Sequence, residues 1–175
     1  MLWGATIPLE VRAEGDTIRL RGSFPYGVPT DLAPGRREVV ASGAFTWSEA
    51  FLLYQHDAAR PLASTRAGSL SVRNTTEALE IEAEISAGTS WAADFAAAHR
   101  AGLVTGLSPG FRVSPGGERI ERSADGILRT ITAAELGEVS AVTRPAYSAA
   151  QIEARSWAAE MSTRVDNHPL KRWRL

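Results

Sequence analysis

Two segments of the chain alternate hydrophobic and polar residues with a period of two. In residues 79–85 (LEIEAEI) the aliphatic side chains fall on one side and the glutamates on the other. Residues 17–24 (TIRLRGSF) alternate in the same way, with Ile18, Leu20 and Phe24 on one side. This period is typical of a β-strand with one face in the core and one face in solvent. The pattern therefore predicts a sheet with a solvated outer face.

Shorter patterns predict the remaining elements. We expect further strands over residues 68–72, 105–113, 127–132 and 136–143. We expect helices over residues 46–55 (TWSEAFLLYQ), 90–101 (SWAADFAAAHRA) and 149–160. Thr89 or Ser90 can cap the start of the second of these helices. Residues 25–37 hold three prolines and two glycines and predict a loop.

The order of these elements bears on the fold class. Strands that do not alternate regularly with helices argue against a doubly wound parallel sheet. We therefore expect a β-rich α+β fold, built as an antiparallel β-barrel with flanking helices. A length of 175 residues suits one domain. We place this domain at residues 1–155 and expect a mobile C-terminal tail at 156–175, where periodicity is lost.

Composition excludes several classes of function. The 19 basic and 20 acidic residues give a net charge of -1, which does not favour binding to nucleic acid or to an anionic membrane. No stretch approaches the roughly 18 apolar residues of a membrane span, and the N-terminus lacks the pattern of a secretory signal. We therefore expect a soluble protein inside the cell. The absence of cysteine excludes disulfides, thiol nucleophiles and cysteine zinc sites.

Known cofactor motifs are also missing from the sequence. The chain has three histidines, His56, His99 and His168, without metal-ligand spacing and without an HExxH motif. It contains neither a P-loop nor a GxGxxG motif. We therefore expect no metal and no cofactor.

Three polar residues stand out as candidates for catalysis. His56 follows an apolar run and precedes a loop, a setting that suits a general base but also a surface histidine at a helix C-terminus. Ser108 lies in GLSPGF, where glycines allow a substrate to approach, although a serine in a turn is the ordinary interpretation. Glu138 shares a strand face with Ser140 and can orient an imidazole or simply face solvent; Glu135 is its nearest competitor.

The GLSPGF segment also matches the GxSxG pattern of α/β-hydrolases. Those enzymes follow the order serine, acid, histidine, and their serine sits on a sharp turn between strand and helix. The only histidine after Ser108 is His168, in the expected tail. The residues after Ser108 also look extended rather than helical. A hydrolase-type esterase is therefore a weaker alternative.

Taken in order, four blocks of the sequence resemble the prohead maturation proteases of tailed phages, which are distant relatives of the herpesvirus assemblins. The blocks are residues 42–45 (SGAF), 52–57 (LLYQHD) with Pro-Leu at 61–62, 106–111 (GLSPGF) and 138–146 (EVSAVTRPA). Each block is common by itself, but four in this order are specific. The resemblance covers about residues 17–150.

The resemblance implies a herpesvirus-protease-like barrel and a serine endopeptidase without a cofactor. It implies His56 as base, Ser108 as nucleophile and Glu138 as the third member, with Glu135 and Asp57 as the alternatives. Backbone amides near residues 108–110 or near Arg144 would bind the oxyanion. The implied substrates are the major capsid protein with its scaffold region and the protease itself, inside a prohead assembling in the host cytoplasm. The particle can belong to a phage, a prophage or a gene transfer agent.

A non-enzymatic alternative uses the same fold. A capsid assembly scaffold with a decayed site would need neither His56 nor Ser108, and the sequence retains both. We also expect the basic tail to dock the protease in the shell and to be removed by the protease itself.

Overall fold

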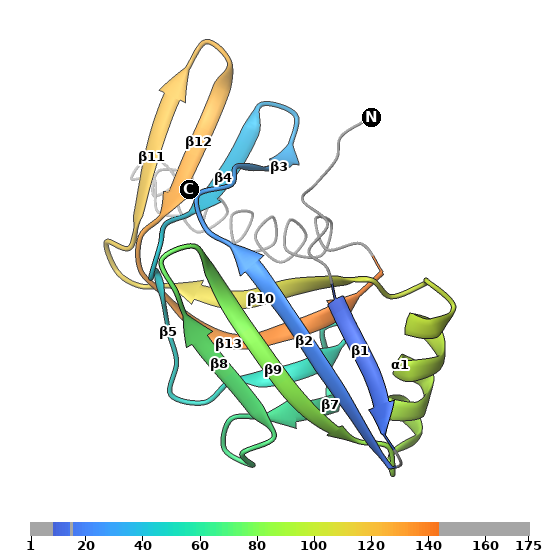
Figure 1. Ribbon diagram of the computed structural model, residues 1–175. Helices are drawn as coiled ribbons and strands as arrows, with labels where there is room; N and C mark the ends of the chain where they lie inside the picture. The colour runs from blue at the N-terminus through green and yellow to red at the C-terminus, as the bar shows by residue number, and fades with distance from the viewer. Residues whose placement is uncertain (1–8, 15, 144–175) are drawn as a thin grey trace, which may run out of the picture.

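The two alternating segments pair with each other in the first of three sheets (Figure 1). The computed structural model describes residues 9–14 and 16–143, and all structural statements refer to these residues. The order of the first sheet is β1-β2-β9-β8, and every pair is antiparallel. Its strands are β1 (Leu9–Glu14), β2 (Thr17–Pro25), β8 (Leu70–Asn74) and β9 (Ala78–Ser86).

The alternation sorts this sheet into two faces, as predicted. Leu20 and Ile85 are completely buried on the inner face. On the outer face Arg19 pairs with Glu84, and Arg21 pairs with Glu82 in the same way. The outer face is therefore charged but balanced.

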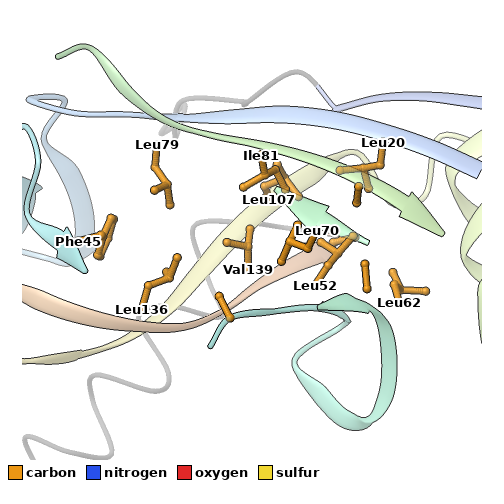
Figure 2. Close-up of a cluster of buried hydrophobic side chains, with 14 of the residues drawn as sticks. Leu20, Phe45, Leu52, Leu62, Leu70, Leu79, Ile81, Leu107, Leu136 and Val139 are labelled. Atoms are coloured by element: carbon orange, nitrogen blue, oxygen red, sulfur yellow. The ribbon is translucent and has the colours of Figure 1, made fainter. Parts of the chain in front are cut away.

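A second sheet packs against the inner face of the first. Its main path is β10-β13-β6-β7, and β5 also pairs with β13. Its strands are β5 (Phe45–Thr46), β6 (Phe51–Tyr54), β7 (Asp57–Ser64), β10 (Gly106–Val113) and β13 (Ala134–Val142). Figure 2 shows Leu79 and Ile81 of the first sheet facing Leu136 and Val139 of the second across the core. β13 thus has one face fixed by the core.

The third sheet, in the order β11-β12-β4-β3, extends away from the other two (Figure 1). Its strands are β3 (Thr30–Ala33), β4 (Arg36–Val40), β11 (Glu118–Ser123) and β12 (Gly126–Ile131). Buried Arg129 lies between Glu38, at 3.0 Å, and Glu118, at 2.5 Å. Burial raises the pKa of Glu38, and the charge and hydrogen bond of Arg129 oppose this rise.

The helix α1 (Ser90–Arg100) lies at the opposite end of the molecule from the third sheet (Figure 1). Thr89 caps it by accepting a hydrogen bond from the amide of Ala92. Phe95 is buried and packs edge-on against Tyr54. Within the described ranges no helix is long and apolar enough to cross a membrane.

The β-rich α+β class is confirmed, as are the helix near 90–101 and the strands over the ranges expected for them. Two local predictions are wrong. Residues 46–55 contain the end of β5 and all of β6 instead of a helix, because both strands pair with β13. Residues 25–37 contain β3 and the start of β4 instead of a loop, because Gly35 allows a tight reversal at positive φ.

The predicted barrel is not confirmed. The strand orders of the described residues give three open sheets, and β13–β5, β13–β6 and β12–β4 are parallel pairs rather than antiparallel ones. The helix expected at 149–160 and the tail at 156–175 lie outside the described residues.

Candidate active site

Ser108 lies inside β10, directly opposite Ser140 of β13. Residues opposite each other in an antiparallel pair share a face of the sheet, with Cβ atoms about 4.5–5.5 Å apart. β10 is at the edge of its sheet, where Pro109 is tolerated. The strand continues to Val113, so the GxSxG segment does not form the strand–turn–helix elbow of α/β-hydrolases.

A β-bulge places Glu138 on the same face as Ser108. Gly110 pairs with Glu138, but Phe111 pairs with Leu136, so Gly137 is the extra residue of β13. Before the bulge Leu136 points into the core, and after it Val139 does. The bulge therefore reverses the alternation, and Glu138 and Ser140 face away from the core.

Gly110 leaves room for the Glu138 side chain. A Cβ at Gly110 would lie 2.6 Å from Cγ and 2.9 Å from the carboxyl carbon of Glu138. Real side chains do not approach so closely, so any other residue at 110 would displace the carboxylate. Glu138 can therefore adopt this position only because residue 110, the last glycine of GLSPGF, has no side chain.

His56 lies in the tight turn between β6 and β7. Tyr54 pairs with Asp57, so Gln55 and His56 form a two-residue turn. Both have positive φ, 58° and 57°, as in a type I′ turn, which normally takes glycine or asparagine. Non-glycine residues in this conformation are strained and cluster at functional sites. His56 therefore lies at a hairpin, not at the helix C-terminus of the ordinary interpretation.

Three hydrogen bonds hold this turn against β13 and Thr143, the residue that follows it. The Gln55 amide donates to the carbonyl of Ala141 at 3.0 Å, and its side chain donates to Thr143 Oγ1 at 2.7 Å. The His56 amide donates to Ser140 Oγ at 3.2 Å. The strained backbone of His56 is thus fixed to the strand that carries Glu138.

The imidazole of His56 contacts the Glu138 carboxylate. His56 Nδ1 lies 2.5 Å from Glu138 Oε1, and both side chains are largely buried. Ser140 Oγ donates to the other carboxylate oxygen, Oε2, at 2.7 Å. His56 Nε2 is buried and has no hydrogen-bond partner in the described part of the chain. The ring is therefore oriented through Nδ1, while Nε2 is left for another group.

The competing residues are engaged elsewhere, exposed to solvent or outside the described part of the chain. Asp57 accepts from the amide of Ala59 and pairs with Arg60 at 3.2 Å. Glu135 is exposed. His99, at the end of α1, contacts the carbonyl of Val104 through Nδ1. His168 lies outside the described residues.

The arrangement of His56 and Glu138 suits proton transfer. Within residues 9–14 and 16–143, no group of acidic residues and histidines is placed to hold a metal ion. A carboxylate on Nδ1 fixes the tautomer of an imidazole, so that Nε2 can accept a proton. Sequence reasoning did not give Ser140 a role, although its i, i+2 spacing from Glu138 places both on one strand face.

Comparison with known proteins bears on this chemistry. The chain matches the model of the family described as caudovirus prohead serine protease over residues 8–164. Searches of the curated proteins and of the solved structures found no match for the chain. The family match includes the strands that carry Ser108 and Glu138 and the hairpin that carries His56. The chain therefore belongs to the family of caudovirus prohead serine proteases.

Proposed function

We propose that this chain is a serine endopeptidase in which Ser108 is the nucleophile, His56 the general base and Glu138 the residue that orients the base. The observation that supports this most directly is the 2.5 Å contact between His56 Nδ1 and Glu138. Beside it, the buried Nε2 has no partner among the described residues. A buried ring nitrogen without a hydrogen bond is costly, and such exceptions are often explained by a catalytic role.

The reaction proceeds through an acyl-enzyme. Ser108 Oγ attacks the scissile carbonyl carbon while its proton passes to His56 Nε2, and Glu138 stabilises the imidazolium. The C–N bond then breaks as Nε2 returns the proton to the leaving amine. Water, deprotonated by Nε2, attacks the ester, and the proton goes back to Ser108 as the acid product leaves.

The nucleophile is not open to solvent in this state. Ser108 is 1% exposed. A peptide bond therefore needs a local opening to reach the Ser108 hydroxyl, as in other enzymes with gated sites. Gating of this kind would restrain the protease before it meets its substrate.

Membership of the family supports a proposal for the substrates. We propose that the protease removes the scaffold-like N-terminal region of the major capsid protein and processes itself. It acts inside the assembling prohead, in the host cytoplasm. Family membership supports a role in prohead maturation, and the substrates and self-processing are our proposal.

A non-enzymatic scaffold explains the site less well. Two non-glycine residues at positive φ destabilise the hairpin by about 1–3 kcal/mol each. A scaffold gains nothing from a strained histidine placed against a carboxylate. An esterase of the α/β-hydrolase type is disfavoured because Ser108 lies within a strand.

Co-expression with the major capsid protein of the same genome tests the function. We expect Ser108→Ala and His56→Ala each to abolish processing while the protein stays folded, because the two residues act as one unit. For the same reason the double variant should be no worse than either single one. The readout is mass spectrometry of the capsid protein N-terminus.

A matched control is Ser71→Ala, which changes an exposed serine of β8. This variant should process the capsid protein at the wild-type rate. Processing at the wild-type rate by Ser108→Ala would show that the nucleophile is another residue.

A further inference from the structure

Ser140 is a completely buried polar residue at the centre of the site. Its neighbours along β13, Val139 and Ala141, belong to the hydrophobic core. A buried hydroxyl is unfavourable unless it is hydrogen-bonded. An aliphatic residue at this position would avoid that cost, so the hydroxyl needs an explanation.

The hydroxyl makes two hydrogen bonds, and both go to the candidate triad. It donates to Glu138 Oε2 at 2.7 Å and accepts from the backbone amide of His56 at 3.2 Å. One hydroxyl thus joins the carboxylate to the backbone of the histidine that this carboxylate contacts. The Glu138 Oε1–His56 Nδ1 contact completes a closed ring of interactions.

The position of Ser140 in the sheet makes this link rigid. It pairs with Ser108 of β10 on one side and with Leu53 of β6 on the other. A strand held on both sides offers a fixed point, whereas the carboxylate can rotate about its last torsion and the hairpin is strained. Ser140 therefore restrains the two parts of the site that would otherwise move.

We infer that Ser140 is a positioning residue that sets the orientation of Glu138 and the conformation of the His56 turn together. This inference rests on the proposed function. Binding Oε2 directs Oε1 at Nδ1, and binding the His56 amide keeps the turn at positive φ. Both restraints determine where Nε2 lies with respect to Ser108.

Ser140→Ala tests this role with a peptide that spans the mapped cleavage site. We expect kcat to fall about 100-fold, the effect typical of misplacing a catalytic group by about 1 Å, and KM to stay within about twofold. Ser140→Cys, which keeps a weak donor of similar shape, should recover part of this loss.

Thr143→Val is the control for loosening the turn alone. It removes the bond from Gln55 but touches neither Glu138 nor Ser140. We expect its kcat to fall by less than about threefold. An equal loss in Thr143→Val and Ser140→Ala would show that Ser140 only anchors the turn, and would overturn the inference about the carboxylate.

A double-mutant cycle tests whether Ser140 acts through Glu138. In a Glu138→Ala background, the further loss from Ser140→Ala should shrink to less than about threefold, because residues in one network are not additive. A full 100-fold loss in that background would overturn the inference.

Proton NMR of the inactive Ser108→Ala protein separates this inference from the proposed function. With His56 bonded to Glu138, its Nδ1–H resonance lies far downfield. Ser140→Ala should shift this resonance upfield and speed its exchange with water, and Thr143→Val should leave it in place. If the resonance is unchanged in Ser140→Ala, the positioning role of Ser140 is overturned, and this result does not depend on protease activity. If Ser108→Ala still cleaves the substrate, only the proposed function is overturned.

Discussion

At the scale of single residues, Gly110 is constrained by the side chain of another residue. Glycines in a GxSxG segment suggest backbone freedom, but Gly110 lies within a strand and its φ is not in the left-handed region. The constraint is steric, since the Glu138 side chain lies across its Cα.

Gly110→Ala should therefore lower activity by displacing Glu138. We expect kcat/KM to fall about 100-fold and stability to fall by about 1–3 kcal/mol, as for other overpacked sites. Activity assays and thermal unfolding measure both effects. Gly88→Ala is the control, because a Cβ there would meet only Ser86 Oγ, at 3.4 Å. Wild-type activity in Gly110→Ala would contradict the proposed position of Glu138.

Glu138→Gln tests the carboxylate without changing its size. A neutral amide cannot stabilise the imidazolium and allows the wrong tautomer, so we expect kcat to fall by between about 10² and 10⁴. Glu135→Gln, which changes an exposed residue of the same strand, should stay within about twofold of wild type. If Glu135→Gln lost this activity and Glu138→Gln kept it, Glu135 rather than Glu138 would be the residue that orients His56.

Sequence reasoning named His56, Ser108 and Glu138 but left Glu135 and Asp57 open. The choice depends on which carboxylate faces the ring, and that depends on strand register. The bonds of Ser140 and the steric demand at Gly110 depend on the same register across β10 and β13. Spacing along the chain cannot supply these contacts, because Gly110 and His56 lie 28 and 82 positions from Glu138.

At the scale of elements, the sequence predicts a strand correctly where hydrophobic and polar residues alternate along it without interruption. β2 and β9 show a period of two and were predicted almost to their ends. β11 is exposed at every residue and has no such signal. The segment 46–55 contains good helix formers, but pairing with β13 overrides that local preference.

The sequence of β13 departs from the strand period of two at one point. Its core residues Leu136 and Val139 are three positions apart, with Gly137 between them. A spacing of three inside a strand indicates a bulge, and bulges often lie beside active sites. Here the bulge allows one strand to supply both the core and the site.

The β6–β7 hairpin contributes the third part of the site. Its two central residues lack the glycine or asparagine that would mark a type I′ turn in the sequence. The segment therefore looked helical, with His56 in a loop beyond its end. Tertiary hydrogen bonds to Ser140, Ala141 and Thr143 stabilise a turn that the local sequence does not favour.

At the scale of the whole molecule, a cluster of hydrogen bonds and aromatic contacts joins the first two sheets. The Tyr26 hydroxyl donates to the side chain of Asn74, at the end of β8, and Asn74 Nδ2 donates to the carbonyl of Phe45 at 2.7 Å. The ring of Phe45 packs between Tyr26 and Phe111, the residue after Gly110. This cluster connects the first sheet to the strand that carries Ser108.

The pH dependence of folding stability tests this connection. Burial raises the pKa of Tyr26 to about 12, above the value of about 10 expected in the unfolded chain. Between these values the unfolded state loses a proton that the folded state keeps. The contribution of Tyr26 to stability is therefore complete below about pH 10 and is lost as the pH rises through about 12.

Tyr26→Phe should remove this dependence along with the hydrogen bond to Asn74. At pH 8 we expect the free energy of unfolding to fall by about 1 kcal/mol, because the hydrogen bond from the buried Tyr26 to Asn74 is lost. Between pH 10 and 12 the variant should lose less stability than the wild type, so the two curves should converge. Urea unfolding at intervals of pH measures both curves. Parallel curves over that range would show that Tyr26 does not stay protonated in the folded state, and the phenol would then not be the buried link between the sheets.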